Sequence, residues 1–198
     1  MKQSQTLSYR FRTQRTDRIR VDGEEVVSIV ELAFVEDAAI EVVIERCRTD
    51  VPEVLFVESN EAQLRVTRTS PVDHVANEAE STHSVIIGAD AEVGVEFLVT
   101  PTNRSVVRLW NGWIIGDTPN AWVGNAGMIV EELSPPMGAD RRIRLWCSDG
   151  LGNADFDDLV VVVTIGENLL EEDGDADRVL RYLEEPTVTA TTGEDEEE

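Results

Sequence analysis

The sequence has almost no lysine. Lys2 is the only one, and all the other basic residues are arginine, in a chain whose 40 acidic residues give a formal net charge of −23. In molar salt the long apolar stem of lysine favours association, whereas arginine holds a carboxylate through a planar fork. The Debye length there is only about 3 Å, so that repulsion among the carboxylates is largely screened. The acid excess then serves hydration and solubility, and the composition indicates a protein built for very high salt.

Long apolar runs and cysteines are also scarce. No run approaches the roughly 20 apolar residues of a membrane span, and residues 1–5 lead to no apolar signal core. Two cysteines, Cys47 and Cys147, are too few for a disulfide framework. One bridge between them is open, and buried free thiols are the favoured alternative. The apolar fraction of 41% nevertheless excludes a disordered chain, and 198 residues suffice for one sizeable domain.

Signatures of catalysis are missing as well. The sequence contains no GxSxG, GxxxxGK[ST], GxGxxG, HExxH or CxxC motif. Its two histidines, His74 and His83, lie in a polar stretch and are interpreted as exposed loop residues. Carboxylates are so numerous that no acid–base pair can be singled out, which leaves a paired-carboxylate hydrolase without support. We therefore expect a protein that is not an enzyme.

What the sequence does contain, over most of its length, is short runs rich in β-branched residues. Asp22-Gly23, Asn111-Gly112 and Asp149-Gly150 supply turn signals between them, and no helical period intervenes. This spacing predicts an all-β fold, a single antiparallel β-sandwich of jelly-roll type with about ten strands. The candidate strands are residues 7–12, 18–21, 26–34, 40–44, 53–57, 63–68, 84–87, 93–100, 106–110, 113–115, 127–133, 142–147 and 159–165.

Charge divides the chain into three zones. Residues 1–20 form an Arg-rich N-terminal arm or first strand, residues 21–166 the β-sandwich domain, and residues 167–198 an acidic C-terminal helix and tail. One short helix is predicted near Leu180, capped by an aspartate and stopped by Pro186. Both termini are expected to be extended, and the arginines of the arm are the candidate assembly residues, namely Arg10, Arg12, Arg15, Arg18 and Arg20.

Two acidic clusters resemble ion sites. The first departs from a calcium loop because Arg178 stands where glycine is needed, although its acids fall at suitable positions, namely Asp173, Asp175, Asp177 and Glu184. The second lies in a glycine-containing loop and consists of Asp149, Asn153, Asp155 and Asp157. Alternating acids also arise by chance in so acidic a chain. No cofactor is expected, and Ca²⁺ or Mg²⁺ are the ions that these clusters would suit.

Tryptophans gather in one segment. Trp110, Trp113 and Trp122 lie within 13 residues, in a stretch rich in glycine and asparagine. Such rings either stack on sugars or bases or fill a core that is short of other aromatics, and the core role is favoured for at least two of them. Residues 107–112 are weakly repeated at 143–146. Either the similarity arises by chance, or two strands that end in tryptophan pair or occupy equivalent places in two sheets.

The acidic, nearly lysine-free composition resembles that of haloarchaeal proteins and of the viruses that infect haloarchaea, and the expected sandwich resembles virion coat and decoration proteins. These resemblances imply a structural virion protein, with copies of itself and other virion proteins as partners. A haloarchaeal module that binds carbohydrate or another ligand through its tryptophan loops is the alternative, and a tail tube or head–tail connector is the second. Direct nucleic-acid binding is not expected, because phosphate contacts need clustered cations and weaken in salt. The implied location is the virion, or otherwise the cytoplasm of a halophilic host.

Overall fold

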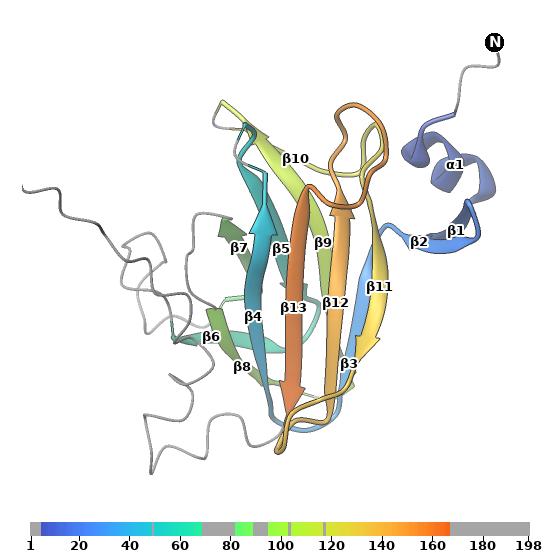
Figure 1. The fold of residues 1–198 in the computed structure, drawn as a ribbon. Helices are drawn as coiled ribbons and strands as arrows, with labels where there is room; N and C mark the ends of the chain where they lie inside the picture. The colour runs from blue at the N-terminus through green and yellow to red at the C-terminus, as the bar shows by residue number, and fades with distance from the viewer. Residues whose placement is uncertain are drawn as a thin grey trace, which may run out of the picture.

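The computed structural model describes residues 5–48, 50–68, 82–88, 95–102, 104–116 and 118–166. Over these ranges the protein is an antiparallel β-sandwich of two sheets, and Figure 1 shows β4, β13, β12 and β11 side by side in one of them. The predicted all-β sandwich is confirmed, whereas its likeness to a jelly roll stays a prediction. The elements are α1 (Leu7–Gln14), β1 (Arg18–Val21), β2 (Glu24–Val27), β3 (Val30–Phe34), β4 (Ala38–Cys47), β5 (Glu53–Ser59), β6 (Gln63–Arg68), β7 (Ser84–Gly88), β8 (Val95–Thr100), β9 (Ser105–Ile115), β10 (Thr118–Asn120), β11 (Gly127–Leu133), β12 (Arg141–Ser148) and β13 (Leu159–Gly166).

The two sheets differ in size. The larger has eight strands in the order β1-β2-β11-β12-β13-β4-β8-β6. The smaller has the order β10-β9-β5-β7, and β3 joins it by pairing with β9. Alternate side chains of most strands enter the space between the sheets, as expected where one face is buried and the other meets water. β13 is buried at every residue because it lies in the middle of the larger sheet.

The weak repeat places two strands in equivalent positions of the facing sheets. β9 belongs to the smaller sheet and β12 to the larger, and the two strands do not pair. Leu109 and Leu145, which correspond in the repeat, are both fully buried in the core between the sheets. Trp110 and Trp146, the next residues along, point to the outer faces because side chains alternate along a strand. The two strands therefore do not pair, and their places in the two sheets are those that structural equivalence would give.

Three local expectations were wrong. Residues 7–12 belong to helix α1. Thr6 caps this helix, because its side chain accepts a hydrogen bond from the backbone N–H of Tyr9. The helical period also puts Leu7 and Phe11 on one buried face. The expected strand 26–34 is two strands, since the chain passes from the larger to the smaller sheet between β2 and β3. Asn111-Gly112 lies inside β9 and not in a turn. Thirteen strands are therefore found in the described residues where about ten were expected.

Asp22-Gly23 does form the expected turn. Both residues have positive φ, 51° and 97°, which is the conformation of the tight type I′ connection between β1 and β2. The predicted C-terminal helix and tail fall in residues 167–198 and lie outside the described residues. In the described part of the chain, none of the helical structure is long and apolar enough to cross a membrane.

No disulfide joins the two cysteines, and Cys147 is buried as expected, whereas Cys47 is only partly buried. Cys147 pairs in register with Leu159, and Leu159 pairs on its other side with Cys47. The two thiols are thus separated by two strand spacings, roughly 10 Å, which is beyond the reach of a disulfide bond. Cys147 is fully buried, and burial raises the pKa of its thiol well above the ordinary value.

Candidate functional site

Helix α1 packs on a small core of its own. Leu7 and Phe11 are buried together with Ile19 of β1 and Val26 of β2, separate from the main core. The backbone N–H of Leu7 donates to the Asn125 side chain at 3.1 Å, which fastens the helix to the loop between β10 and β11. Figure 1 shows α1 and the β1–β2 hairpin to one side of the sandwich. The expected N-terminal arm is therefore a folded helix-and-hairpin unit over residues 5–27.

A groove separates this unit from the sandwich. Its volume is about 540 Å³, and apolar side chains make up most of its wall. Arg12 provides the only cationic side chain among the lining residues, which are Ser8, Phe11, Arg12, Ser28, Ile29, Trp122, Val123, Gly124 and Ala126. Three segments meet here, namely α1, the crossing from β2 to β3 and the β10–β11 loop. An apolar groove with one charged group at its rim suits an apolar partner that carries acid groups.

Trp122 lies in this groove in a strained conformation. Its φ is 57°, in the left-handed region that bulky residues rarely adopt. The ring remains 49% exposed. It stacks on Trp110 with centroids 5.0 Å apart, and Trp110 stacks on Phe56 at 5.3 Å. The indole N–H donates to the Ser28 carbonyl at 3.3 Å. Strain of this kind persists only where its surroundings enforce it, and it clusters at functional positions.

The three predicted tryptophans separate into two roles. Trp110 and Trp113 are buried, with exposed fractions of 7% and 2%, as expected of at least two of the tryptophans, although Trp110 is buried beneath Trp122 and not between the sheets. Trp110 lies under Trp122 on the outer face of the smaller sheet, so the structure brings these two together. Trp113 instead contributes to the buried end of the sandwich, next to Gly150. Only Trp122 is placed to meet a partner.

The arginines of the N-terminal unit lie mostly on its surface. Arg10 donates to the Arg20 carbonyl, and Arg18 forms an exposed ion pair with Glu25 at 2.9 Å. Arg12, Arg15 and Arg20 are exposed, and none of the ion pairs found in the described residues involves them. Residues 5–20 hold these five arginines against the single acid Asp17. Residues 5–20 are therefore a cationic segment of a strongly acidic protein, whereas the whole unit, which also holds Asp22, Glu24 and Glu25, has a formal net charge of +1.

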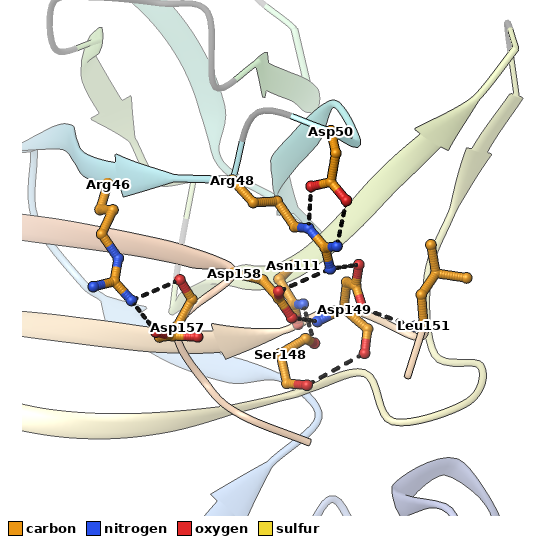
Figure 2. Close-up of polar contacts among 9 residues, drawn as sticks. All are labelled: Arg46, Arg48, Asp50, Asn111, Ser148, Asp149, Leu151, Asp157 and Asp158. Atoms are coloured by element: carbon orange, nitrogen blue, oxygen red, sulfur yellow. Dashed lines mark hydrogen bonds and ion pairs between the residues drawn. The ribbon is translucent and has the colours of Figure 1, made fainter. Parts of the chain in front are cut away.

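A second constellation lies where the β12–β13 loop meets the end of β4 (Figure 2). Arg48 Nη1 contacts Asp149 and Asp158 at 3.0 Å each. The same guanidinium donates from Nε and Nη2 to the two oxygens of Asp50, both at 2.6 Å. The carboxyl of Asp149 is fully buried and that of Asp158 is 6% exposed. Asp158 also accepts the backbone N–H of Asp149 at 2.8 Å, so the cluster fastens the loop to β4.

Arg48 is the charge that compensates these carboxylates. Its hydrogen bond to Asp50 lowers the pKa of that carboxyl. Burial raises the pKa of Asp149, although Arg48 and the backbone N–H of Leu151 oppose the shift. The cluster thus depends on a single arginine to hold two desolvated carboxyl groups, an arrangement in which loss of one partner is costly.

Glu53 is a buried acid that the sequence analysis did not single out. It is completely buried at the start of β5, and neither carboxylate oxygen has a hydrogen-bond partner among the described residues. Burial, followed by the charges of Asp149 and Asp158, raises its pKa to about 8, which keeps the group neutral at pH 7. Its register partner on β9 is Trp113, whose indole N–H is also without a partner in the described residues. The alternation of β5 was the available signal, because Glu53 is in phase with the inward-facing Leu55 and Val57.

Gly150 marks the close packing at this end of the sandwich. A Cβ atom added to it would lie 2.1 Å from the Trp113 ring and 2.7 Å from the Val123 carbonyl. We expect Gly150→Ala to lower the free energy of unfolding by about 1–3 kcal/mol through overpacking. Gly116→Ala, where a Cβ meets no atom within 4 Å but φ is +61°, should cost only about 1–2 kcal/mol of backbone strain. Denaturant unfolding in high salt compares them, and a smaller loss at Gly150 than at Gly116 would contradict this packing.

Only one of the two predicted ion clusters lies among the described residues. The first, Asp173 to Glu184, lies outside the described residues. In the second, the ligand atoms of Asp155, Asp157 and Asp158 lie within 4.8 Å of one another, without Asp149 or Asn153. Arg46 pairs with Asp157 and Arg48 with Asp158, so these arginines already balance much of the negative charge. Asp149 likewise forms an ion pair with Arg48. Ion binding stays a prediction.

Elsewhere on the larger sheet, arginine forks hold surface carboxylates. Arg144 contacts Glu45 at 2.9 Å and Glu131 at 3.2 Å, and its guanidinium lies 5.5 Å from the Trp146 ring centre. The hydrogen bond from Trp146, followed by that from Arg144, lowers the pKa of Glu131. These contacts are of the kind expected to replace lysine pairs at high salt.

The histidines add no further site. His83 is exposed, as expected, and its Nδ1 lies 3.0 Å from the Ala62 carbonyl oxygen. His74 lies outside the described residues.

Comparisons with protein-family models, with curated proteins and with solved structures found no match. The groove and Arg12 in its wall are therefore the features of the described residues that point to a function.

Proposed function

We propose that this protein is a structural subunit of a virus particle of a halophilic archaeon, a coat or capsid-decorating protein that assembles with copies of itself. The observation that carries the proposal is the N-terminal unit. A helix and hairpin that begin with the cationic segment of residues 5–20 lie beside an apolar groove, on the edge of a sandwich whose sequence carries an excess of acids. Neighbouring copies would therefore meet through opposite charges and a shared apolar contact.

High salt decides which contacts contribute to such an assembly. With a Debye length of about 3 Å, long-range attraction between patches is lost. Arginine–carboxylate pairs in direct, bidentate contact keep part of their energy. Burial of apolar surface, such as the half-exposed Trp122, supplies the rest. An assembly built this way forms at the salinity that the composition indicates.

The charge-reversal variant Arg12→Glu/Arg15→Glu tests this function. Light scattering in about 2–3 M KCl should show the full chain as a large, symmetric oligomer. The variant should need about tenfold more protein to assemble, which corresponds to a loss of about 1.4 kcal/mol per contact. Both residues are exposed, so circular dichroism should stay unchanged.

Arg65→Glu/Arg104→Glu is the matched control. It changes the net charge by the same amount at two exposed residues outside the N-terminal unit. The control should assemble like the parent protein. A parent protein that stays monomeric at all concentrations in high salt would overturn the proposed function. An equal loss of assembly in both variants would show that the N-terminal unit has no special part in the contact.

A ligand-binding module remains the second candidate, because Trp122 is half exposed in a groove. Sugar recognition needs several polar groups around the stacking ring to fix the hydroxyls. The groove offers Ser8, Ser28 and Arg12, and the rest of its wall is apolar or glycine. A protein segment with apolar side chains therefore fits better. A monomer whose tryptophan fluorescence responds to a soluble oligosaccharide would favour the module instead.

A further inference from the structure

We infer that the groove beside α1 is the docking site for residues 167–186 of a neighbouring copy of this chain. The inference rests on the assembly proposed above and names the contact that makes it. Three observations lead to it: the chemistry of the groove, the composition of this segment, and the end of the sandwich from which the chain leaves β13.

The groove needs an occupant with apolar side chains. Phe11 and Ile29 line its floor, while Trp122 and Val123 at its rim remain 49% and 52% exposed. Its volume of about 540 Å³ falls within the range of about 300–1,000 Å³ typical of binding pockets. Covering the two rim residues would remove apolar surface from water, and that gain is retained in concentrated salt.

The groove also favours negative charge. Arg12 lines it, and Arg15 and Arg20 are exposed in the same cationic segment, residues 5–20. Residues 167–186 carry eight acids against two arginines, and these acids flank two apolar groups, Leu169-Leu170 and the trio Val179, Leu180 and Leu183. The segment therefore combines what the groove lacks: apolar side chains for its floor, and carboxylates close enough for the direct contacts that persist in salt.

β13 carries the chain away from the groove of its own copy. The groove adjoins Gly124, whose backbone packs on that of Gly150, so it lies at the end of the sandwich where the β12–β13 loop leads into β13. β13 then runs to Gly166, which pairs with Ala39 at the opposite end. Figure 1 shows this strand pointing away from α1. Eight residues span roughly 26 Å, so the chain leaves the domain one sandwich length from its own groove.

A contact between the exit of one copy and the groove of the next is head-to-tail. Such heterologous contacts use two different surfaces, and they generate closed rings or open filaments according to the rotation between neighbours. Each copy then offers one groove and one segment. The contact repeats along the assembly without needing a second interface.

Cross-linking of the full chain tests the inference. A photoreactive residue replaces Val123, which lines the groove and is exposed, and chains labelled with ¹⁴N and ¹⁵N are mixed in about 2–3 M KCl. We expect mixed-isotope cross-links from position 123 to residues 167–186. Leu180→Asp/Leu183→Asp should reduce their yield about tenfold. The same probe at Ile86, an exposed residue of β7, should give no link to this segment.

The outcomes separate the inference from the proposed function. Links from position 123 to another segment, or links only within single copies, overturn the inference, while an assembly seen by light scattering in the same sample leaves the proposed function standing. A monomer in light scattering overturns both. Unchanged cross-linking of the leucine variant, with its fold intact by circular dichroism, shows that the apolar side chains are not the docking groups and also overturns the inference.

Discussion

Arg48→Met is expected to lower the free energy of unfolding by about 3–5 kcal/mol, the usual cost of removing one partner of a buried ion pair. Arg48 holds two carboxyls, that of Asp149, which is fully buried, and that of Asp158, which is 6% exposed. Methionine keeps most of the apolar stem of the side chain but supplies no charge or donor. Two desolvated acids would then face each other near Glu53, so the β12–β13 loop should detach or the acids take up protons. Denaturant unfolding at pH 7 in high salt measures the loss.

Arg46→Met provides the matched control. Arg46 lies two residues earlier, at the end of β4, and pairs with Asp157, and both side chains are about half exposed. An exposed pair of this kind contributes about 0–1 kcal/mol. A similar loss of unfolding free energy in both variants would show that burial does not determine how much the Arg48 cluster stabilises the protein.

The stability of the protein is expected to fall as pH rises from about 5 to about 8, because Glu53 titrates in the folded state only at the upper end of this window. Its pKa is raised to about 8 by burial and by the neighbouring carboxylates, whereas an unfolded chain releases this proton near pH 4.3. Between these values the folded state binds more protons than the unfolded state, so stability decreases with pH. The slope approaches about 1.4 kcal/mol per pH unit and levels off above the folded pKa.

Glu53→Gln isolates this contribution. Glutamine has nearly the same shape and does not titrate, so the decline between about pH 5 and pH 8 should be reduced by a few kcal/mol in total. Glu58→Gln, on the same strand but exposed, should keep the decline of the parent protein. Unfolding curves at several pH values in the same salt give the comparison. A parent slope that persists in Glu53→Gln would mean that another group carries it.

Much of the fold followed from local pattern. The alternation of β-branched residues with turn signals placed most strands within a few residues of their observed bounds, and Asp22-Gly23 forms the tight turn that this dipeptide favours. The failures have a common cause. Asn111-Gly112 has the sequence of a turn, but Phe56 packs over Gly112 from the neighbouring strand and keeps the segment in β9. Long-range packing of this kind has no trace in the local sequence.

The candidate site was less accessible to prediction. The sequence marked the arginines of the N-terminal segment and Trp122, since their types and clustering stood out. It could not show that residues 7–14 form a helix whose apolar face covers a second core. That core exists only after folding has brought the helix together with β1 and β2. The groove arises from three segments that are distant along the chain. Glu53 was hidden among 40 acids, and only its inward phase on β5 sets it apart.

The scarcity of lysine and the excess of acid, read from the sequence alone, determined the chemistry of this surface, because composition fixes how a chain is hydrated and how its charges pair at high salt. Alternation determined that the fold is a sandwich, because a strand with one apolar face must bury it. Only the tertiary structure decided which charges lie in the interior, namely Asp149, Asp158 and Glu53, and which remain outside. It also decided that Arg12 lines a groove, because a groove exists only between segments that folding brings together.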